Sequence, residues 1–162
     1  MNNSKQTQIL IMNNSEKIKS LQTLAELNVD RASGYMKLSE ETKTLDLGIK
    51  AMFVRMSHQS DDYRKELDAH ITKLGGEKVA IENSFLSDVH QAWIKIKAEV
   101  SSNDPETLLS SCKFGENIII WAYESVLGDS EMKDLEIRAL LEKQIAGLKT
   151  SMSVVKVVDE VV

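Results

Sequence analysis

The sequence predicts an all-α protein built as an antiparallel four-helix bundle, with a long crossover between the second and third helices of the bundle. Apolar residues recur at steps of three and four over long stretches, which is the spacing of one helix face. The single proline, Pro105, and the pair Gly75-Gly76 lie in the middle third of the chain, so both flanks run unbroken. With 162 residues, 42% of them hydrophobic, the chain suffices for one domain with a core.

The N-terminal part of the chain differs in composition from the rest. Residues 1–15 are rich in Asn, Ser and Gln and carry no sustained apolar period, so we expect a flexible extension there. Residues 16–160 are expected to form the single four-helix-bundle domain.

Two long helices are predicted before the glycine pair, over about 15–43 and about 46–74. Ser15 and Asp46 are suitable N-cap residues, and Gly75-Gly76 ends the second helix. Because only a few residues separate the two helices, we expect them to be antiparallel neighbours.

A crossover joins the two halves of the chain. The stretch from Gly75 to Asp104 is too long for a hairpin turn, and residues 84–99 within it place apolar side chains on one face. We therefore expect a short helix over 84–99, which carries the chain back along the bundle.

Two further helices complete the predicted bundle, over about 105–127 and about 131–158. Asp104 as a cap, followed by Pro105 at the first helical position, is a strong start signal for the third helix. The order of a short loop, a long crossover and a short loop is that of ferritin-like folds.

Composition excludes several classes of function. The net charge of −5 gives no basic stripe for a nucleic acid backbone. The apolar run Ile9–Met12 is far shorter than the roughly 20 residues of a membrane helix. The single cysteine, Cys112, has no partner for an internal disulfide. We expect a cytoplasmic protein that binds neither nucleic acid nor membrane.

A central polar layer is predicted around Glu116, a carboxylate on the apolar stripe of the third helix. Such a group must find a partner or give up its charge. Tyr35, Tyr63 and Tyr123 each lie near the middle of a helix on its core-facing stripe. We expect these three tyrosines and Glu116 to meet in one layer, where Tyr35 or Tyr63 donates a hydrogen bond to the carboxylate.

A basic side chain is the other partner that Glu116 could have, and Arg55 and Lys149 are the candidates. If the tyrosines alone bind the carboxylate, Glu116→Gln should change the free energy of unfolding by no more than about 1 kcal/mol.

A metal site is the alternative interpretation of Glu116. It stands seven residues before Tyr123, the spacing at which ferritin helices place a ligand carboxylate and a tyrosine on one face. Asp62, Glu66 and His70 follow one another at steps of four on the second helix. Each such step drifts about 40° around a helix, so a solvated face is favoured over a set of ligands. We expect no cofactor, with iron or manganese on these five residues as the alternative.

Several short motifs occur in a characteristic order. They are Gly34-Tyr35, Lys73-Leu74-Gly75-Gly76, His90-Gln91-Ala92-Trp93 with Lys97, Cys112-Lys113 with Gly115-Glu116, and Glu142-Lys143-Gln144. In these motifs the chain resembles, roughly from Leu21 to Val158, a bacterial family of ferritin-like four-helix bundles known as domain of unknown function 2383.

The resemblance implies an internal repeat of two helical hairpins, in which residues 28–35 align with residues 112–119. Relatives of this kind often carry a carboxylate where Ala32 stands and a histidine where Met152 stands, and this chain has neither. The family has no established activity that could be transferred.

A structural or interaction module that self-associates, with a dimer favoured, is the function that these observations favour over an enzyme. The ligand set is incomplete, and apolar residues remain after the predicted core is filled. These residues are Ile118, Ile120, Trp121, Val154 and Val158. The alternatives are a ferritin-like dinuclear metal protein, acting as an oxidase or in metal storage, and a small-ligand binder with a pocket near Trp93.

Overall fold

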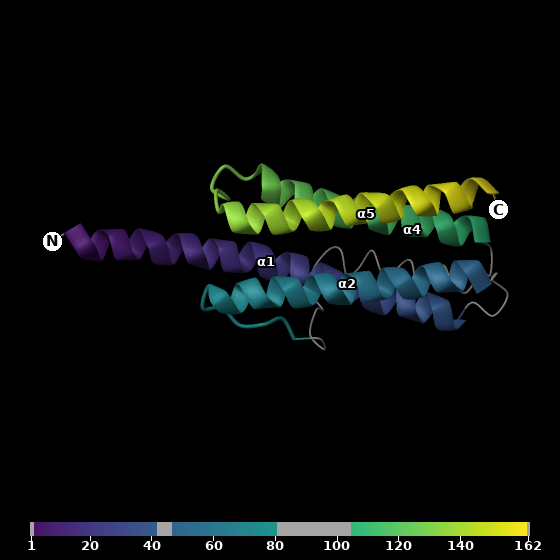
Figure 1. Ribbon diagram of the computed structural model, residues 1–162, viewed down its shortest axis with the longest axis horizontal. Helices are drawn as coiled ribbons and strands as arrows, with labels where there is room; N and C mark the ends of the chain where they lie inside the picture. The colour runs from purple at the N-terminus through teal and green to yellow at the C-terminus, as the bar shows by residue number, and fades with distance from the viewer. Residues whose placement is uncertain (1, 42–46, 81–104, 162) are drawn as a thin grey trace.

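Four helices make up the regular structure that the computed structural model describes, which covers residues 2–41, 47–80 and 105–161 (Figure 1). They are α1 (Asn2–Glu41), α2 (Leu47–Lys73), α4 (Pro105–Gly128) and α5 (Leu135–Val161), and no strand occurs in these three ranges. The predicted all-α class is confirmed. The helix predicted over 84–99 lies outside the described residues.

The first helix begins at Asn2, well before the predicted start at Ser15. Residues 1–15 contain neither glycine nor proline, so the sequence holds no strong breaker on the N-terminal side of Ser15. The start of α2 at Leu47 and the start of α4 at Pro105 lie within one residue of their predicted positions.

The last helix begins at Leu135, whereas the sequence predicted about 131. Asp134 is the cap: its Oδ1 accepts hydrogen bonds from the backbone N–H groups of Glu136 and Ile137, both at 3.1 Å. Asp129 instead closes the preceding turn, because its Oδ1 accepts from the N–H of Glu131 at 2.9 Å. These two aspartates leave residues 129–134 as a connection.

The glycine pair ends α2 as predicted. Gly75 has a φ of +89°, a conformation that side chains with a Cβ rarely adopt. The N–H of Gly76 donates to the carbonyl of Ile71 at 2.9 Å, and that of Gly75 donates to the carbonyl of Thr72 at 3.0 Å. These two bonds satisfy carbonyls that the helix end leaves open. A Cβ on Gly76 would lie 2.7 Å from Ile18, so this turn packs closely on α1.

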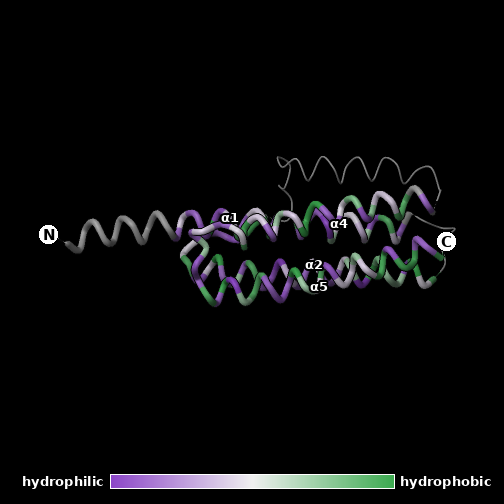
Figure 2. The backbone as a smooth tube through the Cα atoms, turned by 90° about the horizontal axis from the view of Figure 1, so that it is seen from above, coloured by the Kyte–Doolittle hydropathy of each residue, from purple (hydrophilic) through white to green (hydrophobic). Residues whose placement is uncertain are grey.

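The helices pack as two pairs around one long axis. Figure 1 shows α1 leading away from the N label and α2 returning beside it, with α4 and α5 stacked on them as a second pair. Figure 2 shows the bundle from above, with α1 and α4 on one side of the axis and α2 and α5 on the other. Each helix therefore has two neighbours and one diagonal partner.

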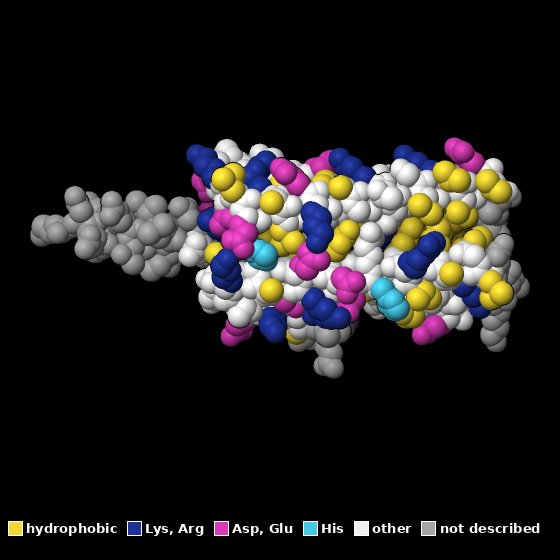
Figure 3. Space-filling view, in the orientation of Figure 1, with side chains coloured by type: hydrophobic (Ala, Val, Ile, Leu, Met, Phe, Trp, Pro, Cys, Tyr) yellow, Lys and Arg dark blue, Asp and Glu magenta, His cyan; other side chains and the backbone are white. Residues whose placement is uncertain are grey.

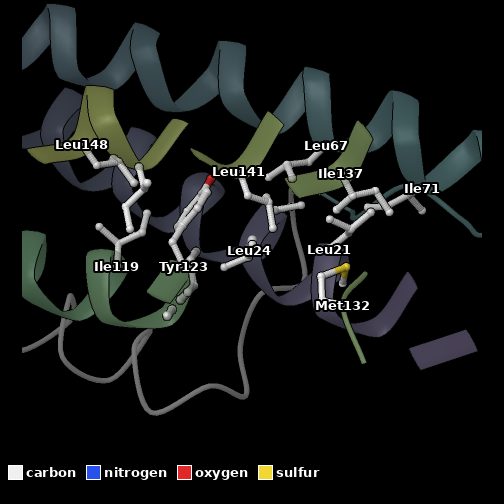
Figure 4. Packing of buried hydrophobic residues seen from close by; sticks show 14 residues of the cluster. Leu21, Leu24, Leu67, Ile71, Ile119, Tyr123, Met132, Ile137, Leu141 and Leu148 are labelled. Atoms are coloured by element: carbon white, nitrogen blue, oxygen red, sulfur yellow. The ribbon is translucent and has the colours of Figure 1, made fainter. Parts of the chain in front are cut away.

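Buried apolar side chains form two clusters along this axis. Figure 4 shows the larger cluster, in which Leu21, Leu67 and Ile119 interdigitate with side chains of α5 such as Leu141. Tyr35, Phe53 and Leu109 belong to the second cluster. The junction of the two clusters is occupied by buried polar residues.

Among the described residues, no helix combines the length and the apolar character needed to cross a membrane.

Candidate functional site

An ion pair between Arg31 and Glu116 lies at the centre of the buried polar residues. Arg31 Nε donates to Glu116 Oε1 at 2.7 Å, and Arg31 Nη2 donates to Oε2 at 3.2 Å. Both side chains are 0% exposed. This two-point contact is the geometry in which a guanidinium binds a carboxylate most strongly.

The position of Arg31 follows from the helical repeat of α1. Leu24, Asn28, Arg31, Tyr35 and Leu38 recur at steps of four and three, and all five are buried. Arg31 therefore stands in the middle of the stripe that faces the core.

The remaining bonds of this ion pair reach a third helix and an aromatic neighbour. Arg31 Nη1 donates to Ser60 Oγ at 2.7 Å and to the carbonyl of Met56 at 3.2 Å, both on α2. The Tyr35 hydroxyl donates to Glu116 Oε1 at 2.7 Å. The guanidinium also lies 5.2 Å from the centroid of the Tyr35 ring. Arg31 thus ties α1 to both α2 and α4.

The protonation states in this group are fixed by their surroundings. Burial raises the pKa of the Tyr35 hydroxyl well above its ordinary value, and the charge of Glu116 raises it further. Burial alone would lower the pKa of Arg31, but the neighbouring Glu116 and Tyr35 outweigh that effect, and the pKa is raised. Tyr35 therefore stays a neutral donor and Arg31 stays charged.

A second hydrogen-bonded group lies beside the first. Asn28 Nδ2 donates to the Tyr123 hydroxyl at 2.8 Å, which donates to Gln144 Oε1 at 2.6 Å. Gln144 Nε2 in turn donates to the carbonyl of Tyr63 at 3.2 Å. This chain of bonds runs through all four helices.

The residues of the predicted layer are thus divided between two groups. Tyr35 and Glu116 are bonded directly, whereas Tyr123 belongs to the second group. Tyr63 is half-buried and contributes its backbone carbonyl, and its hydroxyl lies so close to Gly147 that a Cβ there would be 1.9 Å away.

Four polar members of these groups were not predicted from the sequence: Asn28, Arg31, Ser60 and Gln144. Asn28 and Arg31 could have been found, because they continue the spacing of four and three between Leu24 and Tyr35 on the apolar stripe. The suggested basic partners of Glu116 were wrong. Arg55 is exposed, and Lys149 pairs with Glu124 at 3.3 Å.

The candidate metal ligands are not brought together. Asp62 is exposed, Glu66 lies 3.5 Å from Lys143, and His70 Nε2 lies 3.5 Å from Glu136. Within the ranges that the structure describes, no three His, Cys, Asp or Glu side chains approach closely enough to hold an ion.

Glu116 is not suited to bind a metal in this arrangement, because a guanidinium cation already stands beside its carboxylate. A divalent cation there would face the charge of Arg31. The residues therefore do not fit the dinuclear centre that ferritin-like folds can carry.

The single cysteine is also sealed in the core. Cys112 is 0% exposed, and burial raises the pKa of its thiol, with the charge of Glu116 adding to the effect. Since the thiolate is the reactive form, this side chain is inert at neutral pH.

A surface groove runs between α2 and α5, where Figure 3 shows hydrophobic side chains gathered toward the C-terminal end of α5. It measures about 290 Å³, and Met52, Met56 and Val154 line it. Ser151 Oγ donates to Gln59 Oε1 at 3.0 Å, so these two polar groups of its lining bind each other. The pocket suggested near Trp93 lies outside the described residues.

Comparison with models of protein families gives a match over most of the chain. The family model described as "Domain of unknown function (DUF2383)" matches residues 16–129. The matched range includes Arg31, Glu116 and most of the helices that carry them. No curated protein was found to be similar to the chain.

Proposed function

We propose that this chain, which belongs to the DUF2383 family, is a self-associating helical-bundle module with a structural or interaction role, and that it is not an enzyme. The observation that carries this proposal is the ion pair of Arg31 and Glu116 at the centre of the bundle. Among the described residues these two charged side chains are fully buried, and they bind each other and groups on α1, α2 and α4.

The free-energy cost of burying such an ion pair supports a role in specifying structure. Removing two charges from water costs several kcal/mol per ion, and good geometry with further hydrogen bonds is needed to offset that cost. Here Ser60, Met56 and Tyr35 supply those bonds. Buried polar pairs of this kind have their best-attested use in fixing the register and partners of helices.

The proposal includes an antiparallel, ferritin-like bundle. The pairs that support this arrangement run in opposite senses along neighbouring helices. On α1, Gln22 binds the carbonyl of Glu77, just beyond the end of α2, while Arg31 binds Ser60 in the middle of α2. On α4 and α5, Lys113 pairs with Asp159, Tyr123 binds Gln144, and Arg138 binds the carbonyl of Leu127.

Self-association is supported by large apolar side chains that remain in water. Trp121 is 66% exposed and Phe114 is 57% exposed, both on α4. Large aromatic side chains that are more than half exposed are typical of surfaces that contact another protein. A cytoplasmic location is part of the proposal and is supported by the presence of a single, unpaired cysteine.

Light scattering on the full chain tests the proposal. We expect a particle of more than one chain at micromolar concentration, with a two-fold dimer the simplest form. A single-chain mass that persists up to the highest soluble concentration would contradict it.

A further inference from the structure

The outer face of α4 carries a ridge of three apolar side chains, Phe114, Ile118 and Trp121. Phe114 and Trp121 are exposed and Ile118 is half-buried, whereas Glu116, on the opposite side of the same helix, is fully buried. Seven residues make nearly two turns of a helix. The Cα atoms of Phe114 and Trp121 therefore lie on nearly the same line along α4, about 10 Å apart.

Two charged residues of α4 flank this ridge on one side. Lys113 and Glu124 are separated by three turns and therefore also lie on one line. Lys113 pairs with Asp159 on α5, and Glu124 pairs with Lys149 on α5. In the ion pair near Phe114, α4 thus contributes the base, Lys113. In the ion pair near Trp121, α4 contributes the acid, Glu124.

From this pattern we infer that a second copy of the chain docks on the ridge, with the two α4 helices antiparallel about a two-fold axis near Asn117 and Ile118. This inference rests on the proposed self-association and names its surface. The axis passes midway between Phe114 and Trp121, so Phe114 of one copy meets Trp121 of the other.

The charges favour the same arrangement. The midpoint of Lys113 and Glu124 falls within about one residue of the axis, so each lysine faces the glutamate of the second copy. Parallel helices about a two-fold axis would instead place the charged sides of the two ridges on opposite sides of the interface, so that neither charge would face a partner in the second copy. Like charges that face each other weaken an interface, and complementary charges set its register.

The other strongly exposed apolar residues carry no aromatic ring. Leu47 and Leu135 are the first residues of α2 and α5, and the remaining ones lie along α5: Val154, Val157 and Val161. Of the described side chains, only those of α4 present two exposed aromatic rings on one line.

Charge reversal tests the inference by sedimentation velocity. Lys113→Glu gives a ridge with two acids, and Glu124→Lys gives a ridge with two bases. Each variant alone should dissociate, with a Kd raised at least about 10-fold over the unmodified chain. An equimolar mixture should recover association, because every acid then faces a base. Singles that associate as the unmodified chain does, or a mixture that does not recover, would overturn the inference.

A matched control separates this effect from the loss of a surface ion pair. Lys73→Glu makes the same charge change and breaks the exposed pair of Lys73 with Glu136, between α2 and α5. It should leave the Kd unchanged, and circular dichroism should show that all three variants keep their helices. An equal rise in Kd for this control would also overturn the inference.

Cross-linking tests the position of the axis. Asn117→Cys places an exposed thiol beside its counterpart, and an added oxidant should join two chains by a disulfide. The native Cys112 is buried and should not react. Glu142→Cys, on the exposed face of α5, is the control. Cross-linking of the control that is as fast as that of Asn117→Cys would contradict the proposed axis.

The tests also separate the two proposals. A monomeric unmodified chain removes both self-association and this surface. If the oligomer persists in both charge-reversal variants, self-association stands and only the ridge is excluded as its contact surface. With Trp93→Phe as the background, Trp121 should emit as a solvent-exposed indole in dilute monomer and shift to shorter wavelength on association. Shielded emission in the monomer would mean that the chain itself covers the ridge and would overturn the inference.

Discussion

Arg31 is the residue on which the interior of the bundle depends most. It is among the largest fully buried side chains, and its charge is balanced by one residue that is 85 positions away in sequence. The helical repeat of α1 could have predicted its burial, but a sequence does not state which distant acid neutralises it. Glu116 could be identified as a buried carboxylate, while its partner depended on how α1 and α4 are aligned.

The first prediction concerns Glu116→Gln. The tyrosines alone would make this change nearly neutral, but it leaves the Arg31 guanidinium buried without its counter-charge. We therefore expect a loss of about 3 to 5 kcal/mol in the free energy of unfolding, measured with urea. The double variant Arg31→Met/Glu116→Leu removes both charges and should lose less than Glu116→Gln alone. A double variant that is less stable than the single one would contradict this account.

The second prediction concerns metal. Because Arg31 stands beside Glu116, neither Fe(II), Mn(II) nor Zn(II) should raise the thermal midpoint of the unmodified chain, and a chelator should not lower it. The same result is expected for Glu116→Gln. A midpoint that rises stoichiometrically with added metal in the unmodified chain, and not in the variant, would favour the dinuclear alternative.

At the scale of elements, the start of α4 at a proline and the end of α2 at a glycine pair were predictable from the sequence. The start of α5 was not. Pro105 and Gly75-Gly76 restrict the backbone by themselves. The region 129–134 offers two aspartates that can each bind nearby N–H groups, and only the structure decides that Asp134 is the cap. Packing decides such cases, because several local solutions have similar energies.

The contact of α2 with α5 gives the third prediction. A Cβ on Gly147 would lie 1.9 Å from the Tyr63 hydroxyl, so Gly147→Ala must displace that ring or the helix. We expect a loss of about 1 to 3 kcal/mol in the free energy of unfolding. Gly128→Ala is the matched control, because nothing lies within 4 Å of its Cβ, and it should change stability little.

Removing the hydroxyl should relieve part of this strain. Tyr63→Phe in the Gly147→Ala background is expected to recover stability relative to Gly147→Ala alone. Additive losses in a double-mutant cycle would show that the two side chains do not collide.

At the scale of the whole molecule, the two apolar clusters are joined through a polar junction that is bonded across every helix. The sequence predicted the number of helices in the bundle, their faces and the existence of polar residues at mid-length. It did not predict that the polar residues form two groups, because the division depends on how far each helix is shifted against its neighbours. Such shifts are properties of the assembled bundle.

The fourth prediction is an alkaline limit of stability. Burial raises the pKa of the Cys112 thiol above its ordinary 9.0, and it raises those of the Tyr35 and Tyr123 hydroxyls above 10.0. The folded state therefore holds these protons where the unfolded state releases them. The stability they contribute is fully present below about pH 9 and is lost as the pH rises above that value.

Urea titrations between pH 7 and pH 11 measure this loss. Cys112→Ala and Tyr35→Phe should each lower the stability at pH 7 and make its decline above pH 9 less steep. A decline of unchanged slope in both variants would assign the alkaline loss to other groups.

The ion pair of Arg31 and Glu116 also constrains how the sequence can change over generations. Replacing Arg31 or Glu116 alone by a neutral residue leaves an unpaired charge in the interior. A lineage that changes from this pair to an uncharged pair therefore passes through a poorly folding ancestor. Among descendants of one ancestral gene, the two codons should therefore be retained together or replaced together. A lineage that keeps arginine at position 31 with a neutral residue at position 116 should carry a new acid elsewhere in the core, and that acid would mark a second way of assembling the same bundle.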